Sequence, residues 1–331
     1  MAKFMLQRFI GMMVTMLFVS ILVFIIMELP PGDYADRYVF RKYAGSGMQI
    51  TESDLRNIRH ELGLDKPAYV RYSKWIYGIV TRFDFGPSFA FETSANVVIG
   101  QRIWLTMAIL FSTLILTYTI SIPIGIYAAV RRHSIVDYSL TVFSYLGLAL
   151  PNFLLALIML YISVNVFGAS VGGLFSPEFE EASWSFAKFV DLLKHLIVPA
   201  VVLAWSATAL QLQTIRATML DELNKLSVTA ARARGVSEWK LLLKYPARLA
   251  LNPVAGSIGF DINRIFSELP IIALVLGLPE LGELLIRSFI DLDMFVAGAI
   301  LLMLTFLVVV LNFVSDILLA ILDPRIKLQG G

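Results

Sequence analysis

Ionisable and amide side chains occur inside long apolar segments of this chain. In the apolar stretch 249–277, Asp261, Arg264 and Glu268 are spaced i, i+3 and i+7, which places them on one face of a helix. A charge that faces lipid is costly, so we expect this face to point into the protein. A polar translocation path that contacts a substrate is one interpretation, and an ion pair satisfied within the helix is the structural alternative. The candidate path residues are Gln211, Asp261, Asn263, Arg264 and Glu268.

A second candidate site lies in the basic stretch 221–248. Thr229, Ala230 and Ala231 are small and allow another backbone to come close, and Gly235 permits a left-handed turn after a helix. The pattern predicts a helix, a glycine turn and a second helix. A short helix of this kind can dock into a soluble partner, whereas a basic loop that only sets membrane topology is the alternative. The candidate docking residues are Thr229, Ala230, Ala231, Arg232, Arg234 and Gly235.

The sequence argues against several other kinds of chemistry. It has no cysteine, which excludes disulfides, thiolate-bound metals and a catalytic thiol. His60, His133 and His195 are scattered, which argues against a histidine metal cluster. No Gly-x-x-x-x-Gly-Lys-Ser/Thr loop for nucleotide phosphates occurs. We therefore predict that the chain is not an enzyme and holds no cofactor or metal.

The elements that must position these residues are membrane helices. Hydrophobic residues make up 58% of the chain and charged residues 16%, against roughly 45–50% apolar residues in soluble domains. The apolar residues form blocks of about twenty or more, the length that crosses roughly 30 Å of hydrocarbon. We predict an all-α integral membrane protein with about six transmembrane helices. The predicted spans are 9–29, 103–130, 138–167, 196–215, 249–277 and 294–322.

Lys and Arg in the short connections predict the orientation of the chain. Arg131, Arg132 and the many basic residues of 221–248 lie in connections on one side, and such loops are typically cytoplasmic. We therefore expect both termini in the cytoplasm. The first apolar block is too long for the apolar region of a signal peptide and is interpreted as a retained helix. Arg216 lies near the inner end of its span, where its side chain is expected to snorkel to the interface.

The predicted organisation has four parts, and the second is a cap outside the membrane. In this cap, Thr51-Glu52-Ser53-Asp54 predicts a helix start, and residues 69–79 predict a second, interfacial helix. The cap is either a lid over the helix ends or a docking surface for a substrate-delivering protein. The parts are the first transmembrane helix 1–29, the extracytoplasmic cap 30–100, a five-helix core 101–323 that contains the basic loop 221–248, and the cytoplasmic tail 324–331.

Several motifs resemble those of bacterial ABC import permeases. Thr229-Ala230-Ala231, followed after three residues by Gly235, is similar to the Glu-Ala-Ala-x-x-x-Gly coupling loop of that family. Thr229 stands where the family has Glu, Glu280 where the dipeptide/oligopeptide/nickel branch usually has Gly, and Ala273 where that branch has Glu. Motifs that resemble this branch are Pro31-Gly32-Asp33, Glu61-Leu62-Gly63-Leu64-Asp65-Lys66-Pro67, Asp84-Phe85-Gly86-Pro87-Ser88, His195-Leu196-Ile197-Val198-Pro199-Ala200, Pro279-Glu280-Leu281-Gly282 and Leu322-Asp323-Pro324-Arg325-Ile326.

The resemblance implies a permease subunit of an ATP-driven, binding-protein-dependent importer in the cytoplasmic (inner) membrane of a prokaryote. Its implied partners are a second homologous permease subunit, two cytoplasmic ABC ATPase subunits that bind the ATP, and an extracytoplasmic solute-binding protein. The implied substrates are oligopeptides or oligosaccharides, with nickel less favoured. The alternative from another class is a secondary transporter that uses the charges of the fifth helix as an ion relay.

Overall fold

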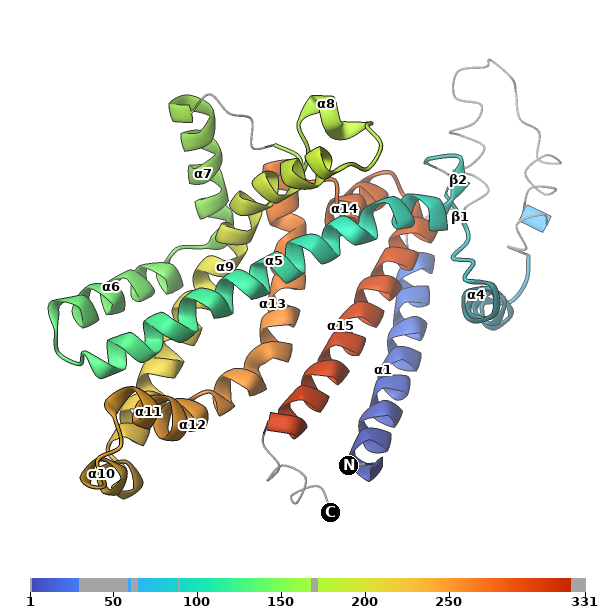
Figure 1. Cartoon of the computed structure of the whole chain (residues 1–331). Helices are drawn as coiled ribbons and strands as arrows, with labels where there is room; N and C mark the ends of the chain where they lie inside the picture. Colours follow the sequence, from blue (N-terminus) through green and yellow to red (C-terminus); the bar gives the residue numbers. More distant parts are fainter. Residues whose placement is uncertain (1, 30–58, 61–64, 89, 168–171, 323–331) are drawn as a thin grey trace. The chain divides into compact units, whose positions relative to one another are not determined.

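The computed structural model describes the chain except for residues 1, 30–58, 61–64, 89, 168–171 and 323–331 (Figure 1). The described residues are mainly helical, and the only strands among them are β1 (Pro87–Ser88) and β2 (Thr93–Ser94), which pair antiparallel. This confirms the predicted all-α class. The chain divides into two compact units. The first unit comprises Met1–Met12, Trp104–Glu283 and Leu307–Gly331, and the second comprises Met13–Ile103 and Leu284–Phe306.

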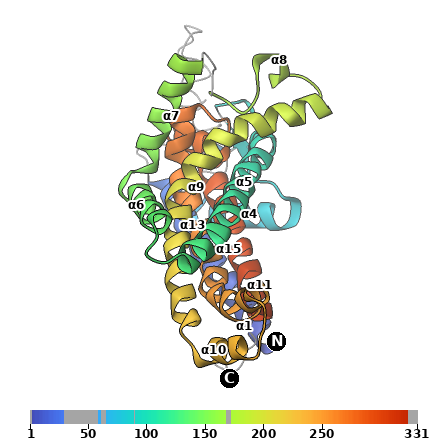
Figure 2. The same cartoon turned by 60° about the vertical axis from the view of Figure 1, so that its left-hand side comes forward.

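The first unit is built around the long helix α9 (Phe186–Leu223). Helices α6, α7, α12 and α13 all contact it (Figure 2). Small residues permit this packing, since a Cβ at Gly147 of α6 would lie 2.8 Å from the Cβ of Ala209. The helices around α9 are α5 (Ala95–Val130), α6 (Ile135–Ala149), α7 (Asn152–Phe167), α12 (Arg248–Ala250) and α13 (Asn252–Leu276).

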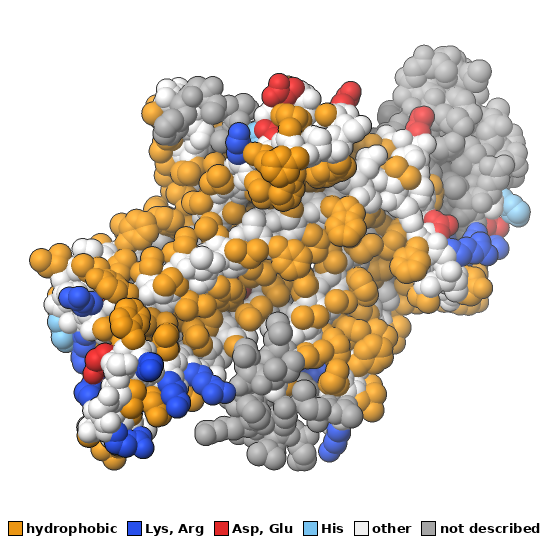
Figure 3. All heavy atoms as spheres, viewed as in Figure 1, with side chains coloured by type: hydrophobic (Ala, Val, Ile, Leu, Met, Phe, Trp, Pro, Cys, Tyr) orange, Lys and Arg blue, Asp and Glu red, His pale blue; other side chains and the backbone are white. Residues whose placement is uncertain are grey.

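A group of short helices connects α9 to α13. Figure 3 shows Lys and Arg side chains gathered at this end of the unit, whereas hydrophobic side chains cover α5, α6 and α7. This distribution agrees with the basic connection expected from the sequence. The elements are α10 (Leu226–Ala233), α11 (Glu238–Leu242), the π-helical turn η1 (Leu243–Ala247) and α12, and a further short helix, α8 (Pro177–Glu180), precedes α9.

The second unit has a core of buried residues from α1, α4 and α15. The core residues include Phe24, Trp75 and Leu302. Helix α4 confirms the helix predicted over residues 69–79, and the helix start predicted at Thr51 lies outside the described residues. The elements are α1 (Ala2–Glu28), α4 (Ala68–Arg82), α14 (Leu281–Ile290) and α15 (Met294–Leu322), and α1, α14 and α15 also extend into the first unit.

The structure corrects one predicted span. The segment 138–167 is not a single helix, because α6 and α7 meet at an angle of 102°. Pro151 separates them, and Leu150 before it is extended with φ −86° and ψ 122°. Proline lacks the N–H that a continuing helix needs, and it disfavours helical geometry at the preceding residue.

Length and composition support fewer than six crossings among the described residues. Three helices satisfy these criteria, or five if the bent pairs α6–α7 and α13–α14 each count as one span. The predicted spans 9–29, 103–130 and 294–322 correspond to the three helices. The predicted fourth span lies within α9, which is not among them. The count of six therefore stays a prediction.

Candidate functional site

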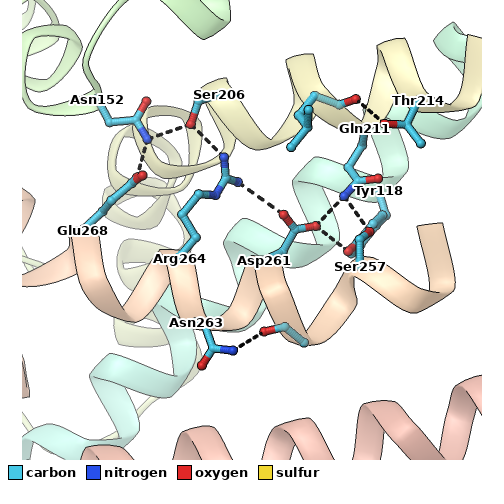
Figure 4. Close-up of polar contacts among 12 residues, drawn as sticks. Tyr118, Asn152, Ser206, Gln211, Thr214, Ser257, Asp261, Asn263, Arg264 and Glu268 are labelled. Carbon is cyan, nitrogen blue, oxygen red and sulfur yellow. Dashed lines mark hydrogen bonds and ion pairs between the residues drawn. The ribbon is translucent and has the colours of Figure 1, made fainter. Parts of the chain in front are cut away.

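The candidate site is a polar network on one side of α13, and Asp261 is its centre (Figure 4). The Asp261 side chain is fully buried, with an exposed fraction of 0%. Its Oδ2 accepts hydrogen bonds from Tyr118 Oη on α5 at 2.7 Å and from Gln211 Nε2 on α9 at 2.8 Å. Gln211 Nε2 also donates to Ser257 Oγ at 2.7 Å. The buried carboxylate therefore connects three helices.

Arg264 occupies the next turn of α13. Its NH2 nitrogen lies 3.5 Å from Asp261 Oδ1, a long contact, while its NH1 nitrogen donates to Ser206 Oγ on α9 at 3.0 Å. The Nε nitrogen is buried and has no hydrogen-bond partner among the described residues. Asp261 and Arg264 thus make their shorter hydrogen bonds with side chains of other helices. An ion pair satisfied within α13 alone does not describe this geometry.

Glu268 continues the network on the half-buried side of α13. Its carboxylate accepts a hydrogen bond from Asn152 Nδ2, at the start of α7. The same Nδ2 donates to Ser206 Oγ at 3.1 Å. Ser206 therefore accepts from both Asn152 and Arg264 and joins the two halves of the network (Figure 4). The bend at Pro151 places Asn152 at this position.

Four of the five predicted path residues belong to the network, and Asn263 does not. Asn263 Nδ2 donates to Gly259 O of its own helix at 2.9 Å, and its Oδ1 lies 3.5 Å from Asn312 Nδ2 of α15. Four further members of the network were not predicted from the sequence: Tyr118, Asn152, Ser206 and Ser257. For Asn152 the sequence did contain one signal of membership, because an amide side chain directly follows a proline within an apolar segment.

Arg216, for which only snorkelling was expected, has a specific partner in the structure. It makes a bidentate ion pair with Asp137 of α6, with Nε to Oδ1 at 2.6 Å and NH2 to Oδ2 at 2.9 Å. Asp137 is buried and also accepts a hydrogen bond from the backbone N–H of His133 at 3.0 Å. A buried carboxylate requires such partners. The pair therefore links α6 to α9.

The second candidate site has the predicted local fold of helix, glycine turn and helix. Helix α10 is followed by Gly235, whose φ of 76° lies in the left-handed region that favours glycine, and α11 begins at Glu238. Arg232 closes the turn by an ion pair with Glu238, with Nε to Oε1 at 2.7 Å. The hydrogen bond from Arg232 holds the pKa of Glu238 below its ordinary value.

The two faces of α10 differ in exposure. Val228 and Ala231 are buried and pack with Leu241 of α11. Leu226, with an exposed fraction of 87%, lies on the outside, and Thr229 and Ala230 are also exposed. Of the predicted docking residues, Ala231 therefore serves the packing of α10 on α11. The exposed members are Thr229, Ala230, Arg232, Arg234 and Gly235.

The connection between α7 and α9 lines an open pocket of about 950 Å³, together with residues of α9 and with Gly277 and Pro279. Two side chains of α9 hold this connection in place. Lys188 Nζ donates to Ala182 O at 2.7 Å, and Asp191 accepts from both the backbone N and Oγ of Ser176, each at 2.7 Å. Burial alone would raise the pKa of Asp191, but the hydrogen bonds from Ser176 hold it below its ordinary value.

Comparisons with known proteins cover nearly the whole chain. The family described as "Binding-protein-dependent transport system inner membrane component" matches residues 121–328. The family of N-terminal parts of such membrane components matches residues 1–119. The oligopeptide transport system permease protein AppB of Bacillus subtilis is 35% identical over 99% of this chain and 100% of its own length. The nickel import system permease protein NikB of Staphylococcus aureus is 28% identical over 99% of this chain and 93% of its own.

A solved structure provides a comparison of the fold. It is a chain of the MetNI methionine ABC transporter in inward facing conformations. It is 17% identical to this chain and has a TM-score of 0.53, over 68% of this chain and 96% of that chain. At this identity the likeness concerns the fold alone.

Proposed function

The chain belongs to the family of binding-protein-dependent transport system inner membrane components, and from this membership we propose that it is the permease subunit of an ATP-driven importer that moves oligopeptides across the inner membrane. The observation that carries the proposal is the full-length similarity to the oligopeptide permease AppB. Nickel is the second candidate, because the nickel permease NikB is also similar over the full length. The oligosaccharide alternative gains no support from these relatives.

Coupling to ATP hydrolysis is assigned to α10. Its exposed face offers Leu226, Thr229 and Ala230, one large apolar and two small side chains that suit insertion into a cleft of an ATPase chain. Its buried face is fixed to α11, and α11 continues through η1 and α12 into α13. A movement of α10 can therefore reach the polar network of α13 as a displacement of packed helices.

The translocation path is assigned to the side of α13 that carries Arg264 and Glu268. Both side chains are half-buried, whereas Asp261 is fully buried and acts as an anchor between helices. The remaining members of the importer are those that the family resemblance implies: a second homologous permease, two cytoplasmic ATPase subunits and an extracytoplasmic binding protein. Both termini then lie in the cytoplasm.

The test is ATP-dependent oligopeptide uptake by the complete importer in proteoliposomes. We expect Ala230→Arg to abolish uptake and binding-protein-stimulated ATP hydrolysis, because it places a long charged side chain on the docking face. The matched control is Ala68→Arg, which makes the same change at an exposed position of α4. Uptake by this chain alone under an ion gradient, unaffected by Ala230→Arg, would instead identify an ion-coupled transporter.

A further inference from the structure

The charges of the polar network do not balance among the described residues. Asp261 and Glu268 supply two carboxylates, and Arg264 supplies one guanidinium. Asp261 has the guanidinium at 3.5 Å together with two neutral donors. Within the described part of the chain, the hydrogen-bond partner of Glu268 is the neutral amide of Asn152. Among the residues that the structure describes, the carboxylate of Glu268 therefore has no ion-pair partner.

A hydrogen-bond donor and a helix N-terminus lie beside Glu268. Asn152 is the first residue of α7, so Glu268 lies beside the N-terminal turn of a 16-residue helix. Helix N-termini carry a partial positive charge that stabilises a nearby carboxylate. The amide of Asn152 adds a hydrogen bond to the charged group, and such bonds are stronger than those between neutral groups.

Glu268 is also the more exposed of the two carboxylates in the network. Asp261 has an exposed fraction of 0%, whereas Glu268 is only partly buried. Arg264, one turn earlier on α13, is held towards Asp261 and Ser206. Its guanidinium is therefore directed away from Glu268, whose carboxylate keeps acceptor capacity beyond the hydrogen bond from Asn152.

We propose that Glu268 binds the α-ammonium group of a peptide in the translocation path, and that Asn152 positions the carboxylate. This inference rests on the proposed function and specifies its substrate class. A carboxylate offers about four lone-pair sites, and an ammonium group carries three donors. A neutral oligosaccharide would leave the charge of Glu268 unpaired. A nickel ion is usually held by several nitrogen or sulfur ligands rather than by one carboxylate.

The test compares two forms of one short peptide, with a free and with an acetylated N-terminus. The pair is chosen so that the binding protein accepts both forms, and initial uptake rates are measured with the complete importer at saturating peptide. For the free peptide, Glu268→Gln should lower the rate about tenfold, the loss expected for one charge-assisted hydrogen bond. The rate for the acetylated peptide should be unchanged, so that the preference for the free form disappears.

Two further variants separate the charge from the structure. Glu268→Asp keeps the carboxylate and should retain most of the preference, while Glu268→Gln keeps a side chain that can still accept the hydrogen bond from Asn152. Asn263→Ala is the control on the opposite face of α13 and should behave as wild type. If the binding protein accepts no acetylated peptide, uptake of the free peptide by Glu268→Gln and Glu268→Asp is compared instead. Equal uptake rates for these two variants would overturn the proposal.

The failure of this inference differs from the failure of the proposed function. If the wild-type complex shows no ATP-dependent uptake, the importer assignment itself is wrong. If wild-type uptake is normal and Glu268→Gln keeps the wild-type preference for the free peptide, only the role of Glu268 is wrong.

Discussion

The side chain of Asn152 donates hydrogen bonds to Glu268 on α13 and to Ser206 on α9. It thereby ties the first turn of α7 to two other helices, directly after the break at Pro151. The bend between α6 and α7 is therefore held by polar contacts as well as by apolar packing. The consequence is that a small change at Asn152 should affect both stability and transport.

Replacement of Asn152 by alanine should destabilise the protein by about 1–3 kcal/mol, because it leaves the Glu268 carboxylate without its donor. Thermal unfolding of the purified protein in detergent measures this change. Asn165→Ala is the matched control, since Asn165 lies on the same helix and, within the described part of the chain, its Nδ2 donates to Tyr161 O of that helix. Equal losses in the two variants would show that the interhelical contacts of Asn152 contribute nothing.

The ion pair between Arg216 and Asp137 predicts a larger effect. Asp137 is buried, and Arg216→Ala would leave its carboxylate without a guanidinium partner. Breaking a buried pair in this way is strongly destabilising, and we expect about 2–3 kcal/mol because the Arg216 side chain is 22% exposed. Arg216→Lys should rescue only part of the loss, because lysine cannot donate in the bidentate geometry.

The control for this ion pair is Arg232→Ala. That variant breaks the ion pair between Arg232 and Glu238, whose side chains are 51% exposed for Arg232 and 58% exposed for Glu238. It should leave thermal stability unchanged, since exposed ion pairs contribute little. A loss at Arg216 no larger than the loss at Arg232 would contradict the role assigned to the buried pair.

The sequence predicts the faces of single helices better than their partners. The spacing of Asp261, Arg264 and Glu268 places them on one face, and the structure confirms this. The same geometry excludes Asn263, because two residues along a helix correspond to a rotation of about 200°. Tyr118 and Ser206 could not be predicted as members of the network, since helical periodicity does not state which helices pack together.

The break between α6 and α7 shows a second limit of sequence analysis. Hydropathy is continuous over 138–167 and therefore predicts one span. Pro151 permits a bend, but prolines also occur in nearly straight helices, and Pro123 and Pro199 lie within the continuous helices α5 and α9. The difference comes from the surrounding packing and from the contacts of Asn152, which involve residues far apart in the sequence.

Asp191 should make the stability of the α7–α9 connection depend on pH. Its ordinary pKa is 3.8, and hydrogen bonds from Ser176 lower the folded value. The folded state thus binds fewer protons than the unfolded state, so this stabilisation is present above about pH 4 and is lost as the pH falls through the folded pKa. Asp191→Asn should therefore destabilise the protein by about 1 kcal/mol at pH 7.

The check is the difference in unfolding temperature between wild type and Asp191→Asn, measured from pH 7 to pH 3. This difference should begin to shrink near pH 4, where the carboxyl of the unfolded state takes up its proton, and should shrink further as the pH falls through the lower folded pKa. Glu178→Gln removes an exposed acid from the same connection and should show no such difference at any pH. A difference for Asp191→Asn that stays constant down to pH 3 would show that its charge is not what stabilises the connection.

Leu226 provides a test of the docking face of α10 that does not disturb its packing. The side chain is 87% exposed, whereas Val228 and Ala231 hold the helix in place. If α10 inserts into an ATPase cleft, Leu226 is buried there, and Leu226→Asp should lower binding-protein-stimulated ATP hydrolysis at least tenfold because a carboxylate would be buried without a partner. Phe186→Asp, at a position 83% exposed on α9, is the control. Thermal stability should be unchanged in both variants. A loss of ATP hydrolysis that occurs only in Leu226→Asp would then report docking of α10. Equal rates of hydrolysis in the two variants would place the ATPase contact elsewhere.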